Sequence, residues 1–237
     1  MALATIEELI AEIARGGMVI LVDDEDRENE GDLVIAAEKA TPETINFLAT
    51  EGRGLICAPL DPQIIERLQL QPMTSHPTDP DECAFTLSVD ARDGTTTGIS
   101  AFDRSHTARL LANPSTQPDA FKRPGHLFPL RAQPGGVLQR TGHTEAAVDL
   151  ARLAGLEPAA VICEVMNEDG SMARFSDLEL FARRHGLLLG TIASLVEYRQ
   201  THEEEMPQSL IENNPPATLE PRCHSKAHLP TPFGKFE

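Results

Sequence analysis

Residues 18–38 read MVILVDDEDRENEGDLVIAAE, an acidic loop enclosed by two apolar runs. This order predicts a buried strand, a tight connection and a second strand. Between the runs, residues 23–32 hold seven carboxylates and one arginine. A charge block of this kind is usually a solvated loop. Because both flanks are strands, however, the carboxylates are tethered at one edge of a sheet, where one or two can converge on a hard cation such as Mg2+ or Mn2+.

The composition excludes several classes of protein. The 237 residues are 41% hydrophobic, enough for one domain with an appendage, and the formal net charge is -17. Nucleic acid and membrane surfaces are therefore excluded as partners, because they are bound by clustered Lys and Arg. No stretch approaches the length of a membrane span, and the N-terminus predicts an acidic amphipathic helix where a signal peptide would be basic and then apolar. The four cysteines show no CxxC spacing, so we expect a protein of the reduced cytoplasm.

Helices and strands alternate along the chain without a clean βαβ repeat. Strands are predicted over 18–22, 32–38, 54–60, 84–90, 160–166 and 187–192. Helices are predicted over 5–15, 42–51, 62–68, 101–112, 145–154 and 194–200, and from Ser176, capped with Glu179, to Gly186. The pattern favours an α+β fold, a mixed twisted sheet flanked by helices in a single domain.

Two stretches predict no regular element. Residues 123–144 are rich in Gly and Pro, and a loop this long in a compact domain is usually functional or disordered. From residue 201 the chain becomes Pro-rich and loses its periodicity. We therefore expect a domain over 1–200 and a linker or tail over 201–237.

His143 lies just before the predicted helix 145–154, for which Thr144 is the expected N-cap. The free N–H groups of a helix start, the Thr144 hydroxyl and Arg140 together form an anion site suited to phosphate. A histidine before a helix is more often structural than a ligand. A functional role is favoured here, because a second histidine, His126, and a Gly-Gly pair share the same irregular stretch.

Glu164 interrupts the apolar run of the predicted strand 160–166. A charge in such a strand is costly unless it is paired or hydrogen-bonded. Either Glu164 faces solvent from an edge strand, or it is a carboxylate at the mouth of an active site whose pKa is displaced for proton transfer. The pattern alone leaves both interpretations open.

The stretch TTTGISAFDRSHT, residues 95–107, gathers hydroxyls at the start of a predicted helix. Ser100 and Asp103 are typical of ordinary helix capping. The hydroxyls of Thr95, Thr96, Thr97 and Thr107 could instead help to hold a polyhydroxylated ligand.

Four stretches of the chain closely resemble the 3,4-dihydroxy-2-butanone 4-phosphate synthase family of riboflavin biosynthesis. They are DDEDRENEGDL (23–33), GTTTGISAFDR (94–104), RPGHLFPLRAQPGGVLQRTGHTEAAVDLARLAG (123–155) and CEVMNEDGSMAR (163–174). They stand in family order, and the similarity runs from about residue 3 to 200. The resemblance implies the fold of that family and a homodimer. It also implies conversion of D-ribulose 5-phosphate, with Mg2+ or Mn2+, into L-3,4-dihydroxybutan-2-one 4-phosphate and formate.

The resemblance also implies roles for individual residues of this chain. The metal ligands of the family fall on Glu28 and His143. Positions needed for catalysis fall on His126, Glu164 and Asp32. Substrate contacts fall on Arg27, Glu28, Asp32, Arg140, Thr141, Gly142, His143, Thr144 and Glu164. Most of the acidic stretch is then expected to be a mobile, water-facing lid, from which Arg27, Glu28 and Asp32 reach the sugar phosphate.

Two features depart from the family. Pro77, Glu82 and Cys83 stand where the family typically has an asparagine and a Gly-Thr pair, which affects the substrate contacts of that loop. The final residues LPTPFGKFE (229–237) resemble the opening of the GTP cyclohydrolase II domain of bifunctional relatives, without its cysteine zinc motif. We expect a shortened or remnant segment there, with no cyclohydrolase activity in these residues.

Two other functions compete with the synthase. A divergent aldolase or isomerase acting on another pentose phosphate would use the same kinds of residue, and the release of formate distinguishes the two. An acidic module that only buffers metal or docks a partner would show no turnover. The anion site at the start of helix 145–154 argues against such a module, which has no use for a phosphate cradle.

Overall fold

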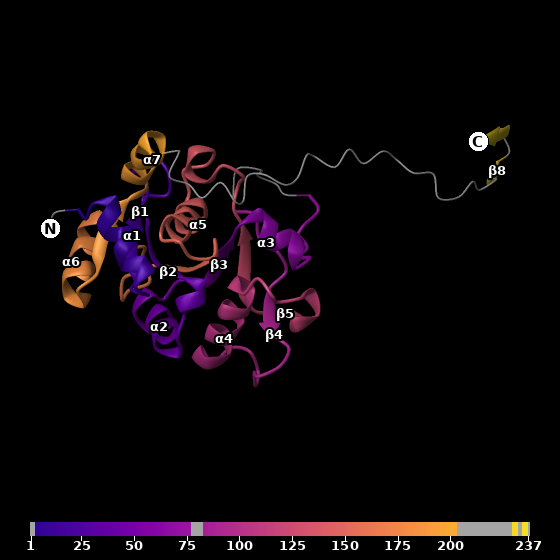
Figure 1. The fold of residues 1–237 in the computed structure, drawn as a ribbon, viewed down its shortest axis with the longest axis horizontal. Helices are drawn as coiled ribbons and strands as arrows, with labels where there is room; N and C mark the ends of the chain where they lie inside the picture. Colours follow the sequence, from indigo (N-terminus) through magenta and orange to yellow (C-terminus); the bar gives the residue numbers. More distant parts are fainter. Residues whose placement is uncertain (1–2, 77–82, 203–228, 232–233, 237) are drawn as a thin grey trace. The chain divides into compact units, whose positions relative to one another are not determined.

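The computed structural model describes residues 3–76, 83–202, 229–231 and 234–236 (Figure 1). The chain divides into two units, Met1–Met206 and Pro207–Glu237. In the second unit β8 (Leu229–Thr231) pairs antiparallel with β9 (Gly234–Phe236). The rest of the predicted tail from residue 203, and the departures at Pro77 and Glu82, lie outside the described residues.

The first unit is built on a seven-stranded sheet in the order β4-β5-β3-β6-β2-β1-β7. Its strands are β1 (Val19–Val22), β2 (Gly31–Ala36), β3 (Cys57–Leu60), β4 (Val89–Ala91), β5 (Phe121–Arg131), β6 (Ala160–Glu164) and β7 (Leu188–Thr191). The pairs β1–β7 and β3–β5 are parallel, and the other pairs are antiparallel. The predicted mixed sheet is therefore confirmed.

Helices cover both faces of this sheet (Figure 1). They are α1 (Ile6–Ala14), α2 (Pro42–Phe47), α3 (Pro62–Arg67), α4 (Ala101–Ala112), α5 (His143–Leu153), α6 (Phe175–His185) and α7 (Ile192–Thr201). Short turns of other helix types are η1 (Ala37–Lys39), η2 (Leu48–Gly52), η3 (Pro118–Ala120) and η4 (Gly136–Leu138). Helices α1, α5 and α7 share one apolar core with the sheet, and α2, α3, α4 and α6 share the other.

The central hairpin β1–β2 is buried on both faces, and its side chains alternate between the two cores. Ile20 and Leu33 belong to the core beneath α2, α4 and α6, whereas Leu21 and Val34 belong to the core beneath α1, α5 and α7. In the register of the hairpin, Leu21 lies opposite Asp32. The carboxylate of Asp32 therefore points to the α5 side of the sheet.

Local capping explains most helix starts. The predicted capping box of Thr5 and Glu8 is present at α1, and Thr41 caps α2 in front of Pro42. Ser100 accepts a hydrogen bond from the Asp103 N–H at the start of α4, as predicted. The predicted helix 42–51 is continued past α2 by the π-helical turn η2, for which Arg53 is the C-cap.

Two helix starts differ from their prediction. Helix α5 begins at His143 with Gly142 as N-cap, so Thr144 lies inside the first turn and does not cap it. Helix α6 is capped by Arg174 with Asp177, two residues earlier than the predicted pair Ser176 and Glu179. Gly142 caps α5 without a side-chain hydrogen bond, whereas at α6 the pair Arg174 and Asp177 has the same spacing as the predicted pair.

The prediction that residues 123–144 form no regular element is wrong for the first part, because β5 spans Phe121–Arg131. Side chains on or beside the neighbouring β4 accept hydrogen bonds from N–H groups of β5, in place of the backbone carbonyls of a regular ladder. Asp90 accepts a hydrogen bond from the His126 N–H at 2.8 Å, and Ser88 accepts one from the Gly125 N–H at 3.1 Å. A Cβ on Gly125 would meet the Val89 backbone at 2.1 Å, so this glycine permits the close approach.

Within the described residues, no helix is long and apolar enough to cross a membrane.

Candidate active site

Two carboxylates face each other where β2 and β6 lie side by side. Asp32 and Glu164 are cross-strand partners on the α5 side of the sheet. Since β6 is the central strand of the seven, the interpretation of Glu164 as a solvent-facing residue of an edge strand is wrong. The side chain of Asp32 is almost fully buried, and burial, with the nearby charges of Glu164 and Glu28, raises its pKa to about 7 despite the opposing charge of His143.

The start of α5 brings His143 to the same place. His143 is 6% exposed, and its Nδ1 lies 3.8 Å from Oε2 of Glu28 in the β1–β2 loop. Burial acts to lower the pKa of His143, but the charge of Asp32 and the contact with Glu28 outweigh it and raise the pKa to about 9. The contact with His143 lowers the pKa of Glu28 to about 2; burial opposes this shift and the charge of Arg27 assists it. The predicted meeting of Glu28 and His143 is thus present in the geometry.

A third carboxylate, Asp23, joins these two residues. The ligand atoms of Asp23, Glu28 and His143 all lie within 4.8 Å of one another. In the described part of the chain, Asp32 Oδ1 and His143 Nε2 are buried polar atoms with no hydrogen-bond partner. Carboxylate oxygens and an imidazole suit Mg2+ or Mn2+, and a divalent charge would offset the clustered carboxylates. The residues present therefore fit a divalent cation.

The segment before α5 is shaped by acidic side chains of that helix. Glu145 accepts hydrogen bonds from the Gln133 N–H at 2.9 Å and from Arg140 at 2.7 Å. Asp149 accepts one from the Val137 N–H at 3.0 Å, and is itself paired with Arg199 of α7. These contacts hold Arg140 over the first turn of α5.

Gly142 leaves room for the guanidinium of Arg140 in this arrangement. A Cβ there would lie 2.2 Å from Nη1 of Arg140. Thr141 is exposed beside the helix start, whereas Thr144 is buried within it. The N–H groups of the helix start, the Arg140 guanidinium and the hydroxyl of Thr141, which is accessible where that of Thr144 is not, are thus available to an anion, and the predicted anion site stays a prediction.

A cavity of about 720 Å³ adjoins the acidic loop and the first turns of α7. Asp23 and Thr141 both line it, and Ile192, Ala193 and Val196 of α7 supply an apolar wall. Its volume is within the range of small-molecule sites. A ligand of the size of a sugar phosphate has room there beside Asp23 and Thr141, whereas the lining does not include Glu28, Asp32, Arg140, His143 or Glu164.

Comparisons with known proteins identify the family of the chain. A sequence profile of 3,4-dihydroxy-2-butanone 4-phosphate synthase matches residues 7–198. The chain belongs to this synthase family. Riboflavin biosynthesis protein RibBA of Aquifex aeolicus is 56% identical over 235 residues, which are 98% of this chain and 54% of the relative. The RibBA of Endomicrobium trichonymphae is 55% identical over 234 residues, which are 99% of this chain and 54% of the relative. This chain thus spans about half the length of the curated relatives it matches.

Solved synthase structures share the fold. A two-domain 3,4-dihydroxy-2-butanone 4-phosphate synthase from A. baumannii is 54% identical with a TM-score of 0.82, over 85% of this chain and 59% of that one. A synthase in complex with two magnesium ions is 45% identical with a TM-score of 0.81, over 86% of this chain and 100% of that one. The α+β fold expected of the synthase family is therefore confirmed.

In this synthase domain, His126 lies apart from the carboxylate cluster. It lies on β5, which is separated from β6 by β3 and from β2 by β3 and β6. At roughly 4.8 Å per strand, β5 is roughly 10 Å from β6 and roughly 14 Å from β2. The Nδ1 of His126 is 2.8 Å from Asp90, and its side chain is 42% exposed. The structure therefore does not bring His126 together with Asp32 and Glu164 within one chain.

Asp23 is the member of the cluster with Glu28 and His143 that sequence reasoning missed. The acidic loop was expected to face water, and Asp24, Glu25 and Asp26 are exposed, but the side chain of Asp23 is only 1% exposed. It accepts hydrogen bonds from the backbone N–H groups of Glu28 at 3.1 Å and Glu30 at 2.8 Å, and from Arg27 at 2.8 Å. Its position directly after a buried strand was the available signal, because an Asp there commonly ties back its own turn.

The side chain of Arg27 pairs with carboxylates of its own loop. Its guanidinium bridges Asp23 and Glu28, at 2.8 and 2.7 Å. It therefore separates two of the carboxylates that flank His143 and reduces their mutual repulsion.

Three of the four threonine hydroxyls in residues 95–107 form hydrogen bonds within the protein. Thr96 donates to Asp103, Thr95 donates to the Ala91 carbonyl, and Thr107 donates to the Asp103 carbonyl. Asp103 also accepts from the Gly98 N–H at 2.9 Å. These bonds support the capping interpretation for Ser100 and Asp103.

Proposed function

We propose that this chain converts D-ribulose 5-phosphate into L-3,4-dihydroxybutan-2-one 4-phosphate and formate, using Mg2+ or Mn2+. Membership of the synthase family supports this activity. The observation that carries it is the meeting of Glu28 and His143 beside the anion site at the start of α5. The five carbons of the substrate are divided between the two products, and their atoms balance without an oxidant, a reductant or water.

Each group has a task that its surroundings suit. Glu28 and His143 would hold the cation, which when bound supplies a Lewis acid beside the carbonyl oxygen of the sugar. Arg140, Thr141 and the N–H groups at the start of α5 would bind the phosphate and so fix the substrate.

The proton transfers would fall to the carboxylates of the sheet. Asp32, with a pKa of about 7, is suited to exchanging a proton near neutral pH. Glu164 lies opposite Asp32 on the neighbouring strand, so the two can act on adjacent atoms of one substrate. His126 lies outside the group formed by Asp32 and Glu164, so it would need to reach the substrate from another surface of the protein.

The activity is tested by incubating the purified protein with D-ribulose 5-phosphate and MgCl2 and measuring formate against substrate consumed. We expect one formate for each substrate. A divergent aldolase or isomerase would instead consume the substrate to give other sugar phosphates without formate. A module that only buffers metal would leave the substrate unchanged. Either of these results contradicts the proposal.

We also propose that the chain forms a homodimer through the side of the sheet at β4 and β5. On the α5 side, the described helices contact β1, β2, β3, β6 and β7, which leaves β4 and β5. Around these strands Leu55 is 44% exposed, Leu87 is 36% exposed and Met73 is 46% exposed. An apolar surface of this kind favours a protein partner, and a second copy would cover it.

Light scattering after size exclusion tests the dimer. We expect about twice the chain mass of 25.8 kDa for the wild type. Leu87→Glu should weaken the dimer at least about tenfold, because a charge would be buried in the interface. Leu180→Glu is the matched control, since Leu180 is 65% exposed on α6, which packs on the opposite face of the sheet. A monomeric wild type, or equal effects of the two variants, would refute this arrangement.

A further inference from the structure

The turn Arg53–Gly54–Leu55 lies against Glu164 at the end of β6. The backbone N–H of Leu55 donates a hydrogen bond to Oε2 of Glu164 at 2.8 Å. Within the described residues, the other carboxylate oxygen of Glu164 accepts no hydrogen bond. One oxygen is thus held by the protein, and the other is left for a reacting group.

Gly54 makes this hydrogen bond possible. A Cβ on Gly54 would lie 2.5 Å from Oε2 of Glu164, 2.6 Å from its carbonyl oxygen and 2.9 Å from its Cβ. Two of these atoms belong to the backbone or to the first side-chain carbon, so they cannot move aside as a flexible chain end would. Any larger residue at position 54 must therefore displace the turn or Glu164 itself.

The turn is fixed from both sides. Arg53 adopts a left-handed conformation with φ of 70°, and its N–H closes the π-helical turn η2 on the Leu48 carbonyl at 3.1 Å. Across from it, the Met166 N–H donates to the Gly52 carbonyl at 2.9 Å. A non-glycine residue in this conformation is costly, and such costs concentrate at functional sites.

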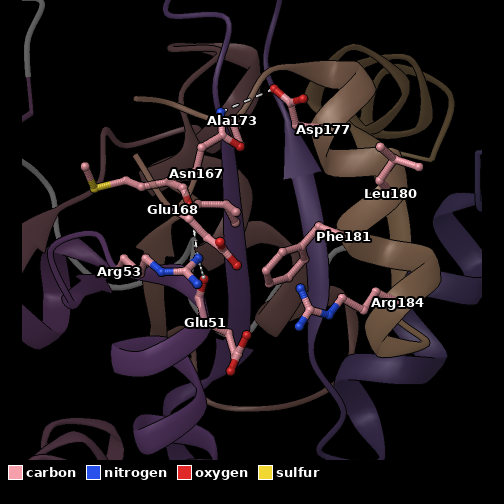
Figure 2. Close-up of a pocket in the computed structure, with 11 residues that line it drawn as sticks. Glu51, Arg53, Asn167, Glu168, Ala173, Asp177, Leu180, Phe181 and Arg184 are labelled. Atoms are coloured by element: carbon pink, nitrogen blue, oxygen red, sulfur yellow. Dashed lines mark hydrogen bonds between the residues drawn. The ribbon is translucent and has the colours of Figure 1, made fainter. Parts of the chain in front are cut away.

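The side chain of Arg53 adds a second tether. Its guanidinium donates to the carbonyls of Glu51 at 3.0 Å and Met166 at 3.1 Å. Figure 2 shows Arg53 reaching along the wall of a cavity of about 240 Å³, with Phe181 and Arg184 of α6 on the far side. The turn is therefore braced from the side of the sheet opposite to α5.

We infer that the Arg53–Gly54–Leu55 turn is a positioning element that holds the Glu164 carboxylate in one orientation toward the substrate. This inference rests on the proposed function of Glu164 in proton transfer. A carboxylate misplaced by about 1 Å can lower a rate by roughly 100-fold. The turn touches neither Glu28 nor His143, so it acts on the chemical step and leaves metal binding unchanged.

Gly54→Ala tests the inference, with Gly190→Ala as the matched control. Gly190 lies in β7, three strands from β6, and its added Cβ would meet Leu9 Cδ1 at 2.5 Å, so it introduces an equally close contact elsewhere, with the end of a buried side chain. We expect Gly54→Ala to lower kcat roughly 10- to 100-fold. The KM for D-ribulose 5-phosphate and the Kd for Mn2+ should each change less than about threefold, because neither depends on Glu164 alone. Gly190→Ala should lower Tm but leave kcat within about twofold.

A double-mutant cycle separates positioning from simple destabilisation. If the turn acts through Glu164, then Gly54→Ala should cause no further loss in a Glu164→Gln background. An additive loss, or a loss of kcat that merely follows Tm in both glycine variants, would overturn the inference.

A crystal structure of Gly54→Ala gives a readout that does not depend on activity. We expect the Leu55 N to Glu164 Oε2 distance to exceed 3.5 Å while the strands keep their register. An unchanged hydrogen bond would refute the inference. Formate release by the wild type reports separately on the proposed function. If Gly54→Ala fails to fold, Arg53→Gly replaces it, because this variant keeps the φ of the turn and removes the guanidinium tether. A kcat of Arg53→Gly equal to that of the wild type would contradict the positioning role of the turn.

Discussion

Glu28→Gln is expected to lower formate release from D-ribulose 5-phosphate at least about 100-fold. The carboxylate of Glu28 lies 3.8 Å from His143 and keeps its charge at all working pH values, because its pKa is about 2. A neutral amide at this position would bind a divalent cation less tightly, and we expect the Kd for Mn2+ to rise at least about tenfold. Steady-state formate production and Mn2+ titration by calorimetry measure the two effects.

Glu25→Gln is the matched control for this experiment. Glu25 is an exposed carboxylate of the same loop and is not a member of the cluster with His143. Glu25→Gln removes one negative charge, as Glu28→Gln does, so any effect of the overall electrostatic potential of the loop appears in both variants. We expect its activity to stay within about twofold of the wild type. Wild-type protein in excess EDTA should fall to the level of Glu28→Gln. Undiminished formate release in EDTA would show that the proposed metal role is wrong.

The affinity for the metal is expected to rise steeply with pH. His143 can act as a ligand only after it loses its proton, and its pKa is about 9 in the metal-free protein. Between pH 7 and pH 9 the apparent Kd for Mn2+ should therefore fall about tenfold per pH unit, and above pH 9 it should level off. Glu28 contributes no slope in this range, because it is already ionised.

Calorimetry in two buffers of different ionisation enthalpy measures this linkage. We expect release of about one proton for each Mn2+ bound near pH 7.5. His143→Gln, which offers an amide oxygen and carries no titrating proton, should bind more weakly and lose most of the pH dependence. Glu25→Gln should retain the wild-type slope. An affinity of the wild type that is the same at pH 7 and pH 9 would contradict the assignment of His143 as a ligand.

The same proton affects the stability of the metal-free protein. The pKa of His143 is raised from 6.5 in the unfolded chain to about 9 in the folded one. The stabilisation from this proton is complete below pH 6.5 and is lost as the pH rises through 9. The raised pKa of Asp32 acts in the same direction at lower pH, because the folded state also binds that proton more tightly between about 4 and 7. The Tm of the metal-free protein should thus decrease from pH 6.5 to pH 9.

Much of this fold follows from local patterns. Capping residues such as Thr5 and Ser100 predicted helix starts correctly, because a cap is satisfied by neighbours within one turn. The apolar runs around residues 23–32 predicted the hairpin β1–β2, since alternation and burial are properties of the segments themselves. Glu28 and His143 were found by their residue types and by the resemblance to the synthase family.

Two of the failures arise from contacts between distant segments, and the third arises from hydrogen bonds within one loop. The prolines of β5 suggested an irregular loop, and only the side chains of Ser88 and Asp90 on or beside β4 show how its N–H groups are satisfied. The edge-strand interpretation of Glu164 failed because strand order is decided by the whole sheet. Asp23 was overlooked because its burial depends on hydrogen bonds to N–H groups within its own loop.

The register of β1 against β2 determines what an error in the pairing of these strands would do. Leu21 and Asp32 are opposite each other, and their side chains lie on the α5 side of the sheet. A slip by one residue would move the carboxylate into the apolar layer beneath α6 and bring apolar side chains into the catalytic layer. Chains with this register error would be both inactive and unstable. Preparations of this protein should therefore lose soluble yield before they accumulate well-folded but inactive molecules.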